Sequence, residues 1–161
     1  MPAPTEPYVL VLGTAQDGGF PQIGSDHDMA RAARRLPALR RHVASLLVAD
    51  PRSGKRWLID ATPDIREQVE TARGHPSSRA LPGPRPPLFD GIFLTHGHMG
   101  HYTGLMHLGR EAYGAKRTPV FASPRMAAFL EANAPWSLLV RLENIVLHRL
   151  QEDTAHELAP G

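Results

Sequence analysis

Three histidines, His96, His98 and His101, fall within six residues of the chain. They follow a short apolar run, residues 91–94, which predicts a buried strand. If the strand continues, His96 and His98 project to the same side, because side chains two residues apart share a face. A turn over residues 97–100 can then bring His101 back towards them. Converging imidazole nitrogens bind transition metals, zinc above all, so the spacing favours a metal site over a solvated histidine-rich loop.

A zinc ion at such a site would activate a bound water. A bound zinc ion lowers the pKa of its water from about 15.7 towards roughly 7, which makes hydroxide available at neutral pH. A catalytic zinc keeps an open position beside about three protein ligands. His96 and His98 would supply two of them, and His101 the third if the turn folds inward. The other histidines considered, His75 and His107, are expected to lie on the surface or in the core, and no catalytic side chain is assigned.

The composition narrows the classes of function. The chain has 161 residues, enough for one domain, and 42% of them are hydrophobic. It has no cysteine, so any metal must be held by nitrogen and oxygen atoms. Lys and Arg outnumber Asp and Glu by only 18 to 16, which argues against nucleic-acid and membrane partners. Residues 1–7 do not resemble a signal peptide, and no apolar stretch approaches the roughly 20 residues of a membrane span, so a cytoplasmic location is expected.

Two segments near the start of the chain have alternative interpretations. Residues 8–13 predict a buried strand, and the loop after it contains Asp17, Gly18 and Gly19. This loop is either a substrate-side loop at the end of a strand or an ordinary tight connection, and its glycines match no phosphate-binding pattern.

Residues 29–41 carry five arginines. A solvated face is favoured there over nucleic-acid binding, because no aromatic residues interleave.

The remaining segments alternate between strands and helices. Residues 42–50 and 56–60 predict a β-hairpin that ends at Asp60, which is either an acceptor for a ligating imidazole N–H or a polar strand terminator. Thr62 and the following proline predict the start of a helix. Further elements are expected at residues 74–87 (a Pro-rich loop), 104–113 (helix), 119–122 (strand), 124–133 (a helix that begins at the Ser123–Pro124 pair) and 144–150 (strand). The alternation indicates an α/β architecture.

Two motifs carry a resemblance to a known family. His96-Gly97-His98-Met99-Gly100-His101 resembles the His-x-His-x-Asp-His signature of metallo-β-lactamase-fold hydrolases. The opening Leu12-Gly13-Thr14-Ala15-Gln16-Asp17-Gly18-Gly19-Phe20-Pro21-Gln22 resembles the first loop of the pyrroloquinoline-quinone biosynthesis protein B group. The stretch His101-Tyr102-Thr103-Gly104-Leu105 is similar to the same group. The resemblance therefore runs from about Tyr8 to the end of the chain.

The resemblance implies an αββα sandwich with a metal site at the edge of its two sheets. His96 and His98 would bind a first metal and His101 a second, and Asp60 matches the family's strand-ending aspartate. The family's remaining ligands come from the second half of the sandwich. Residues 1–161 are therefore expected to form a single, truncated domain, the N-terminal half of the fold. It would be completed by a missing C-terminal half or by a homo-oligomer.

Departures from the pattern refine the expected function. Gly100 replaces the aspartate that ligates the second metal, so one zinc ion is favoured over two, with iron or manganese as alternatives. The biosynthesis group tends to lose the first-site histidines, which this chain keeps. The favoured function is therefore a metal-dependent hydrolase that uses zinc-bound hydroxide on a small-molecule ester, lactone, amide or phosphoester. The alternative is a non-hydrolytic metalloprotein or carrier in pyrroloquinoline quinone biosynthesis.

Overall fold

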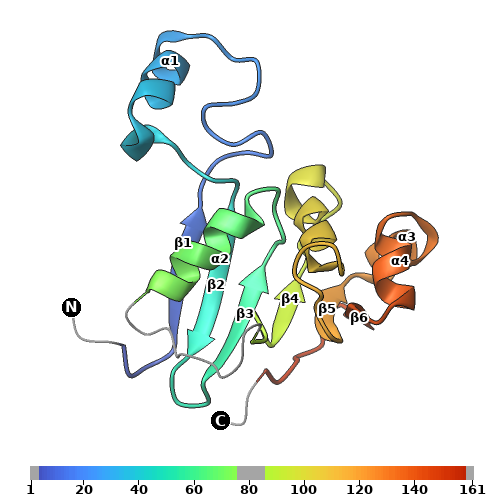
Figure 1. Ribbon diagram of the computed structural model, residues 1–161. Helices are drawn as coiled ribbons and strands as arrows, with labels where there is room; N and C mark the ends of the chain where they lie inside the picture. Colours follow the sequence, from blue (N-terminus) through green and yellow to red (C-terminus); the bar gives the residue numbers. More distant parts are fainter. Residues whose placement is uncertain (1–3, 76–85, 159–161) are drawn as a thin grey trace.

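The computed structural model describes residues 4–75 and 86–158 and contains one mixed sheet of six strands in sequential order (Figure 1). The first three strands are antiparallel, as the predicted hairpin requires, and the last four run parallel. The α/β class is thus confirmed. Most of the Pro-rich loop expected at residues 74–87 lies outside the described residues. The strands are β1 (Tyr8–Gly13), β2 (Ser45–Asp50), β3 (Lys55–Ile59), β4 (Gly91–Phe93), β5 (Thr118–Ala122) and β6 (Ile145–Arg149).

Two of the described α-helices begin where a capping side chain accepts a hydrogen bond from a free backbone N–H group. The Ser123 side chain accepts from the Met126 N–H, with proline at the first helical position, as predicted. The predicted Thr62 cap is wrong by two residues: Asp64 is the N-cap, and the Thr62 hydroxyl instead accepts from the Asp64 N–H. The α-helices are α1 (Asp28–Arg35), α2 (Ile65–Gly74), α3 (Pro124–Ala132) and α4 (Trp136–Arg141). Short 3₁₀ helices are η1 (Pro37–Leu39), η2 (Met99–His101) and η3 (Thr103–Leu108), so the helix expected at residues 104–113 is shorter and tighter than predicted.

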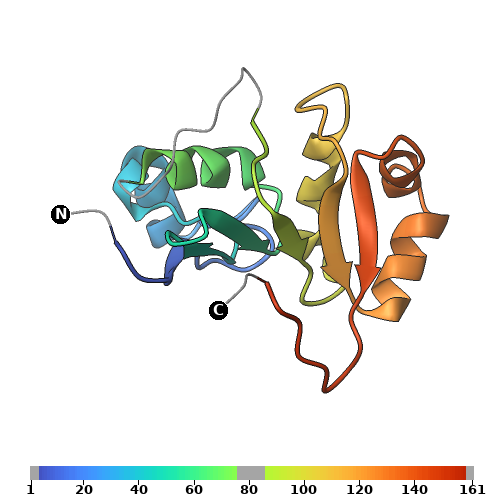
Figure 2. The same cartoon turned by 90° about the horizontal axis from the view of Figure 1, so that it is seen from below.

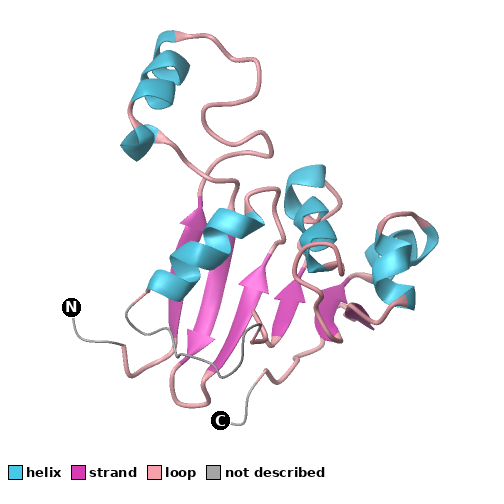
Figure 3. Ribbon diagram, in the orientation of Figure 1, coloured by secondary structure: helices cyan, strands magenta, loops and turns pink. Residues whose placement is uncertain are grey.

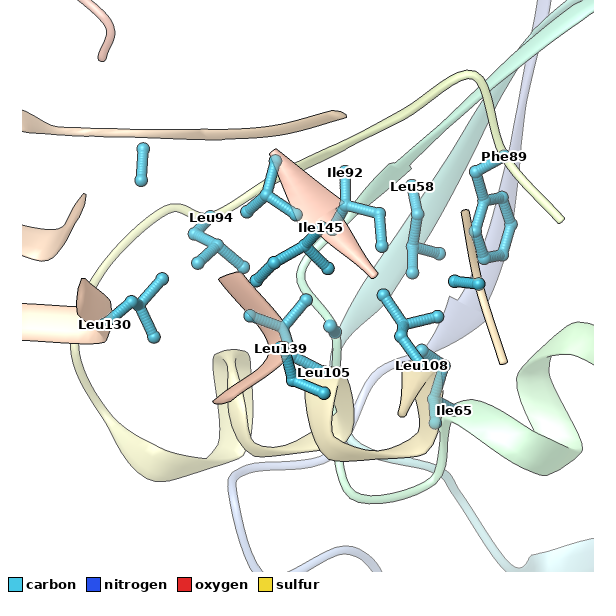
Figure 4. Close-up of a cluster of buried hydrophobic side chains, with 14 of the residues drawn as sticks. Leu58, Ile65, Phe89, Ile92, Leu94, Leu105, Leu108, Leu130, Leu139 and Ile145 are labelled. Atoms are coloured by element: carbon cyan, nitrogen blue, oxygen red, sulfur yellow. The ribbon is translucent and has the colours of Figure 1, made fainter. Parts of the chain in front are cut away.

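The helices that connect the parallel strands cover one face of the sheet (Figure 3). Because β3 to β6 follow one another in a single direction, right-handed crossovers all return on the same side. That face buries a continuous row of paired apolar side chains. They pack against residues of α2, η3, α3 and α4, including Leu105, Leu130 and Leu139 (Figure 4). The row consists of Leu47, Leu58, Ile92 and Val120, each at most 1% exposed.

The opposite face of the sheet is apolar but only partly covered (Figure 2). Val9 and Val11 on β1 are 57% and 55% exposed, because their side chains alternate with those that face the helices. Further along this face, the Phe121 ring stacks on Phe93 and on His148, with centroid distances of 4.5 and 4.9 Å. One β layer with helices on one side corresponds to half of the predicted αββα sandwich. Within the described ranges, no helix is long and apolar enough to cross a bilayer.

The sheet brings three loops to the same edge. β3 and β4 are parallel neighbours, and β1 runs in the same direction as β3 because both are antiparallel to β2. The segments that follow these three strands therefore leave from one end of the sheet (Figure 1). They carry Asp17, Asp60 and the three histidines. The carboxyl ends of parallel strands are the usual location of binding sites in α/β proteins.

Candidate metal centre

The structure brings the three histidine rings together, although by a different route from the one predicted. β4 ends at Phe93, so His96 and His98 lie in a loop, and the argument from a shared strand face is wrong. The loop nevertheless places His96 Nε2 3.1 Å from His98 Nδ1. Helix η2 then turns the chain back, and the ring centroids of His96 and His101 are 4.0 Å apart. The inward fold predicted for the turn is present.

His101 is held by a buried carboxylate. Asp60, 5% exposed, accepts a hydrogen bond of 2.8 Å from His101 Nδ1. The main chain supports this contact, because the Ala61 N–H donates to the His101 carbonyl and the Gly104 N–H donates to the Ala61 carbonyl. The chains approach so closely here that a Cβ on Gly104 would lie 2.0 Å from the Thr62 carbonyl oxygen. Of the two interpretations of Asp60, the contact with an imidazole is the one that the structure contains.

Thr95 connects His96 to the same carboxylate. The Thr95 N–H and hydroxyl both lie 2.8 Å from Asp60 oxygens, and Thr95 Oγ1 is 2.9 Å from His96 Nδ1. A carboxylate only accepts, so the hydroxyl donates to Asp60 and accepts from His96. Both His96 and His101 therefore carry a proton on Nδ1, and Nε2 is the ring nitrogen of each that is left to bind a metal. Sequence reasoning missed Thr95; its signal was a hydroxyl residue directly before the first histidine.

The backbone is strained at Asp60. Its φ is 66°, a left-handed conformation in which aspartate is tolerated better than most residues with a Cβ. In this conformation the carboxylate contacts Thr95 and His101. Such strain persists only where surrounding contacts hold it, and here three hydrogen-bond donors do so.

The loop after β1 contributes Asp17 to the same edge. Asp17 Oδ2 accepts from the Gly100 N–H at 3.1 Å, and Oδ1 lies 3.5 Å from His101 Nε2. The hydrogen bond from the Gly100 N–H is the largest cause that lowers the pKa of Asp17 below its ordinary 3.8. Gly19, at φ 69°, allows the loop to turn. Of the predicted substrate-side residues, Asp17 is the one that these contacts join to the histidine stretch.

The imidazole and carboxylate donors at this edge fit zinc, but they do not complete its coordination. Imidazole nitrogen and carboxylate oxygen are ordinary zinc donors, and the His96 and His98 nitrogens that face each other are close enough to share one ion. Among the described residues, however, no three His, Asp or Glu side chains are arranged to hold a metal ion by themselves.

His107 is not part of the histidine cluster. It lines a cavity of about 1000 Å³ between α2 and η3 with residues such as Ile65 and Leu108.

Comparisons with known families and curated proteins agree with this architecture. The family described as "Beta-lactamase superfamily domain" matches residues 55–161. Coenzyme PQQ synthesis protein B of Rhodopseudomonas palustris (strain BisB5) is 35% identical over 133 residues, which is 81% of this chain and 40% of the relative. The protein of the same name from Gluconobacter oxydans (strain 621H) is 41% identical over 103 residues, 62% of this chain and 32% of the relative.

Two solved structures share the fold. Zinc-bound PqqB from Methylobacterium extorquens has a TM-score of 0.79 at 24% identity and matches 95% of this chain and 52% of that one. A diphosphatase of the PhnP family has a TM-score of 0.67 at 26% identity and matches 94% of this chain and 53% of that one. The chain thus spans about half the length, or less, of the relatives that it matches.

Proposed function

The chain belongs to the beta-lactamase superfamily, and on this basis we propose that it is part of a zinc-dependent hydrolase. The observation that carries the proposal is the hydrogen-bond network of Asp60. It places a proton of His96 and of His101 on Nδ1, so that Nε2 is the ring nitrogen of each that can bind a cation. A neutral imidazole held in this way by a carboxylate is the usual arrangement of a zinc ligand.

In this proposal, His96 and His98 are the principal ligands, with His101 beside them. Zinc would lower the pKa of a bound water and polarise the oxygen of the substrate that gains charge. Asp60 keeps the imidazoles in the tautomer that can bind the metal, directly at His101 and through the Thr95 hydroxyl at His96. His96 and His98 are exposed, so a small-molecule substrate can approach from solvent.

A phosphoester is the favoured substrate among the ester, lactone, amide and phosphoester classes. The support is the likeness to a diphosphatase at 26% identity over 94% of this chain. The second candidate is a non-hydrolytic role in the synthesis of pyrroloquinoline quinone. It is favoured by the 35% identity to Coenzyme PQQ synthesis protein B over 81% of the chain. A cytoplasmic location remains part of the proposal.

The metal content of single variants tests the proposed ligands. We expect His96→Ala and His98→Ala each to lose most of the zinc that co-purifies with the protein, as measured by elemental analysis. His107→Ala is the matched control, because this histidine lies outside the cluster, and it should retain the metal. Equal zinc content in all the variants would refute the assignment.

Hydrolysis of bis(p-nitrophenyl) phosphate separates the two candidate functions. The zinc-loaded full-length protein should release p-nitrophenol, and His98→Ala should reduce the rate at least a hundredfold. Iron bound at the same histidines without cleavage of phosphate or carboxylate esters would favour the non-hydrolytic role.

A further inference from the structure

The space beside Gly100 is filled by another residue of the chain. A Cβ on Gly100 would lie 2.6–2.8 Å from Cγ, Cα and Cβ of Asp17, closer than non-bonded carbon atoms approach. Gly100 is itself buried. Residue 100 therefore cannot carry a side chain while Asp17 is in its present position. In the His-x-His-x-Asp-His signature this position is an aspartate. The space that its Cβ would need is occupied here by Asp17, from the loop after β1.

The Asp17 carboxylate is also oriented towards a metal-binding atom. The Gly100 N–H holds Oδ2, and Oδ1 lies 3.5 Å from His101 Nε2. Because Asp60 accepts the Nδ1 proton of His101, the Nε2 atom of the neutral imidazole presents a lone pair to a carboxylate oxygen. Two atoms that face each other in this way are stabilised by a positive charge between them, either a proton on Nε2 or a metal ion.

The distance between these two atoms fits a metal ion better than a shared proton. An N–H···O hydrogen bond is about 2.7–3.2 Å long, shorter than the 3.5 Å observed. Two donors bound tetrahedrally to one zinc ion at about 2.0–2.2 Å lie roughly 3.3–3.5 Å apart. The separation between Asp17 and His101 is therefore that of two ligands of one ion.

We infer that Asp17 is a metal ligand which, with His101, forms a second cation subsite and replaces the carboxylate absent at residue 100. The inference rests on the proposed function, because it places the second ion beside the one held by His96 and His98. It also revises the expectation of a single zinc ion, which followed from Gly100 alone. In this chain the carboxylate comes from the loop after β1 instead of from residue 100, and it still lies next to His101.

Zinc titration of the full-length protein, by calorimetry with elemental analysis of the product, tests this inference. Wild-type protein should bind two equivalents of zinc. Asp17→Asn should bind one of them at least tenfold more weakly, since the amide can still accept from the Gly100 N–H but carries no charge. With cobalt(II) in place of zinc, the same variant should lose part of the visible absorption of the metal-loaded protein.

Asp50→Asn is the matched control, because Asp50 also accepts backbone N–H groups but lies at the β2–β3 turn. It should bind both equivalents as wild type does. If wild type binds one equivalent, or if Asp17→Asn binds two with unchanged affinity, the inference is overturned while the role of His96 and His98 stands. Absence of zinc from the wild-type protein would instead remove the proposed function itself. A mere ion pair between Asp17 and protonated His101 would leave both affinities unchanged.

Discussion

His101 and the pair formed by His96 and His98 belong to one short motif, yet the protein holds them in different ways. The His101 side chain is 14% exposed and has carboxylates near both ring nitrogens. His96 and His98 are exposed, and the nitrogens of their two rings that face each other are 3.1 Å apart. The difference indicates that one ligand is built into the fold, whereas the other two are free to adjust when an ion arrives. His101 and its partner Asp60, the buried half of the site, should therefore influence stability. His96 and His98, the exposed half, should mainly influence metal affinity.

Removal of the carboxylate that organises the buried half should have the largest effect. We expect Asp60→Ala to lower the free energy of unfolding by about 3 kcal/mol, because it leaves partly buried donors of Thr95 and His101 without their acceptor. Alanine also tolerates the φ of 66° less well than aspartate does. Urea denaturation of the metal-free protein measures the change.

Asp60→Asn is the control for Asp60→Ala, because asparagine tolerates a positive φ and keeps one acceptor oxygen. It should cost about 1 kcal/mol of stability while lowering zinc affinity roughly 10–100-fold. A change of less than 0.5 kcal/mol in Asp60→Ala would contradict the view that the buried half is part of the fold.

Removal of one histidine from each half compares the two directly. In metal-free protein, His101→Ala should lower the free energy of unfolding by about 2 kcal/mol, since it breaks a hydrogen bond to a buried carboxylate. His98→Ala should change it by less than about 0.5 kcal/mol, as is usual for exposed side chains. Thermal or urea unfolding of the two variants side by side gives the comparison, and equal effects would remove the distinction.

Removal of the hydroxyl that joins the two halves should have a smaller effect on stability than removal of Asp60 or His101. Thr95→Val keeps the shape of the side chain but removes the hydrogen bonds to Asp60 and His96, at a cost of about 1 kcal/mol. Zinc affinity should fall roughly tenfold, because His96 loses the partner that fixes its tautomer. Thr95→Ser restores the hydroxyl and should recover the affinity measured by calorimetry. Equal affinities for valine and serine would show that the link is not needed.

Local sequence patterns were sufficient to predict most of the fold. Apolar runs bounded by glycine or proline predicted the strands, and the serine–proline pair at residues 123–124 predicted the start of α3. These signals work because strand and helix formation depend on residues that are close in sequence. The approach of His101 to the other histidines was also predictable, since glycines at residues 97 and 100 permit a tight turn.

Contacts between distant segments could not be predicted in the same way. Asp17 and Gly100 are 83 residues apart, and no local periodicity connects them. The end of β4 at Phe93 was also missed, because the apolar run continues to Leu94, which is buried although it lies outside the strand. The glycine in place of an expected ligand was a signal that another group fills its space, but the identity of that group required the structure.

The packing of Asp17 on Gly100 has an evolutionary consequence. Any side chain at residue 100 collides with Asp17, so the two positions should co-vary among homologous genes: a residue without a large side chain at position 17 where position 100 is aspartate, and aspartate at 17 where position 100 is glycine. A genome survey that requires the aspartate of the His-x-His-x-Asp-His motif would discard this lineage as degenerate. A survey that accepts the carboxylate at either position would retain it.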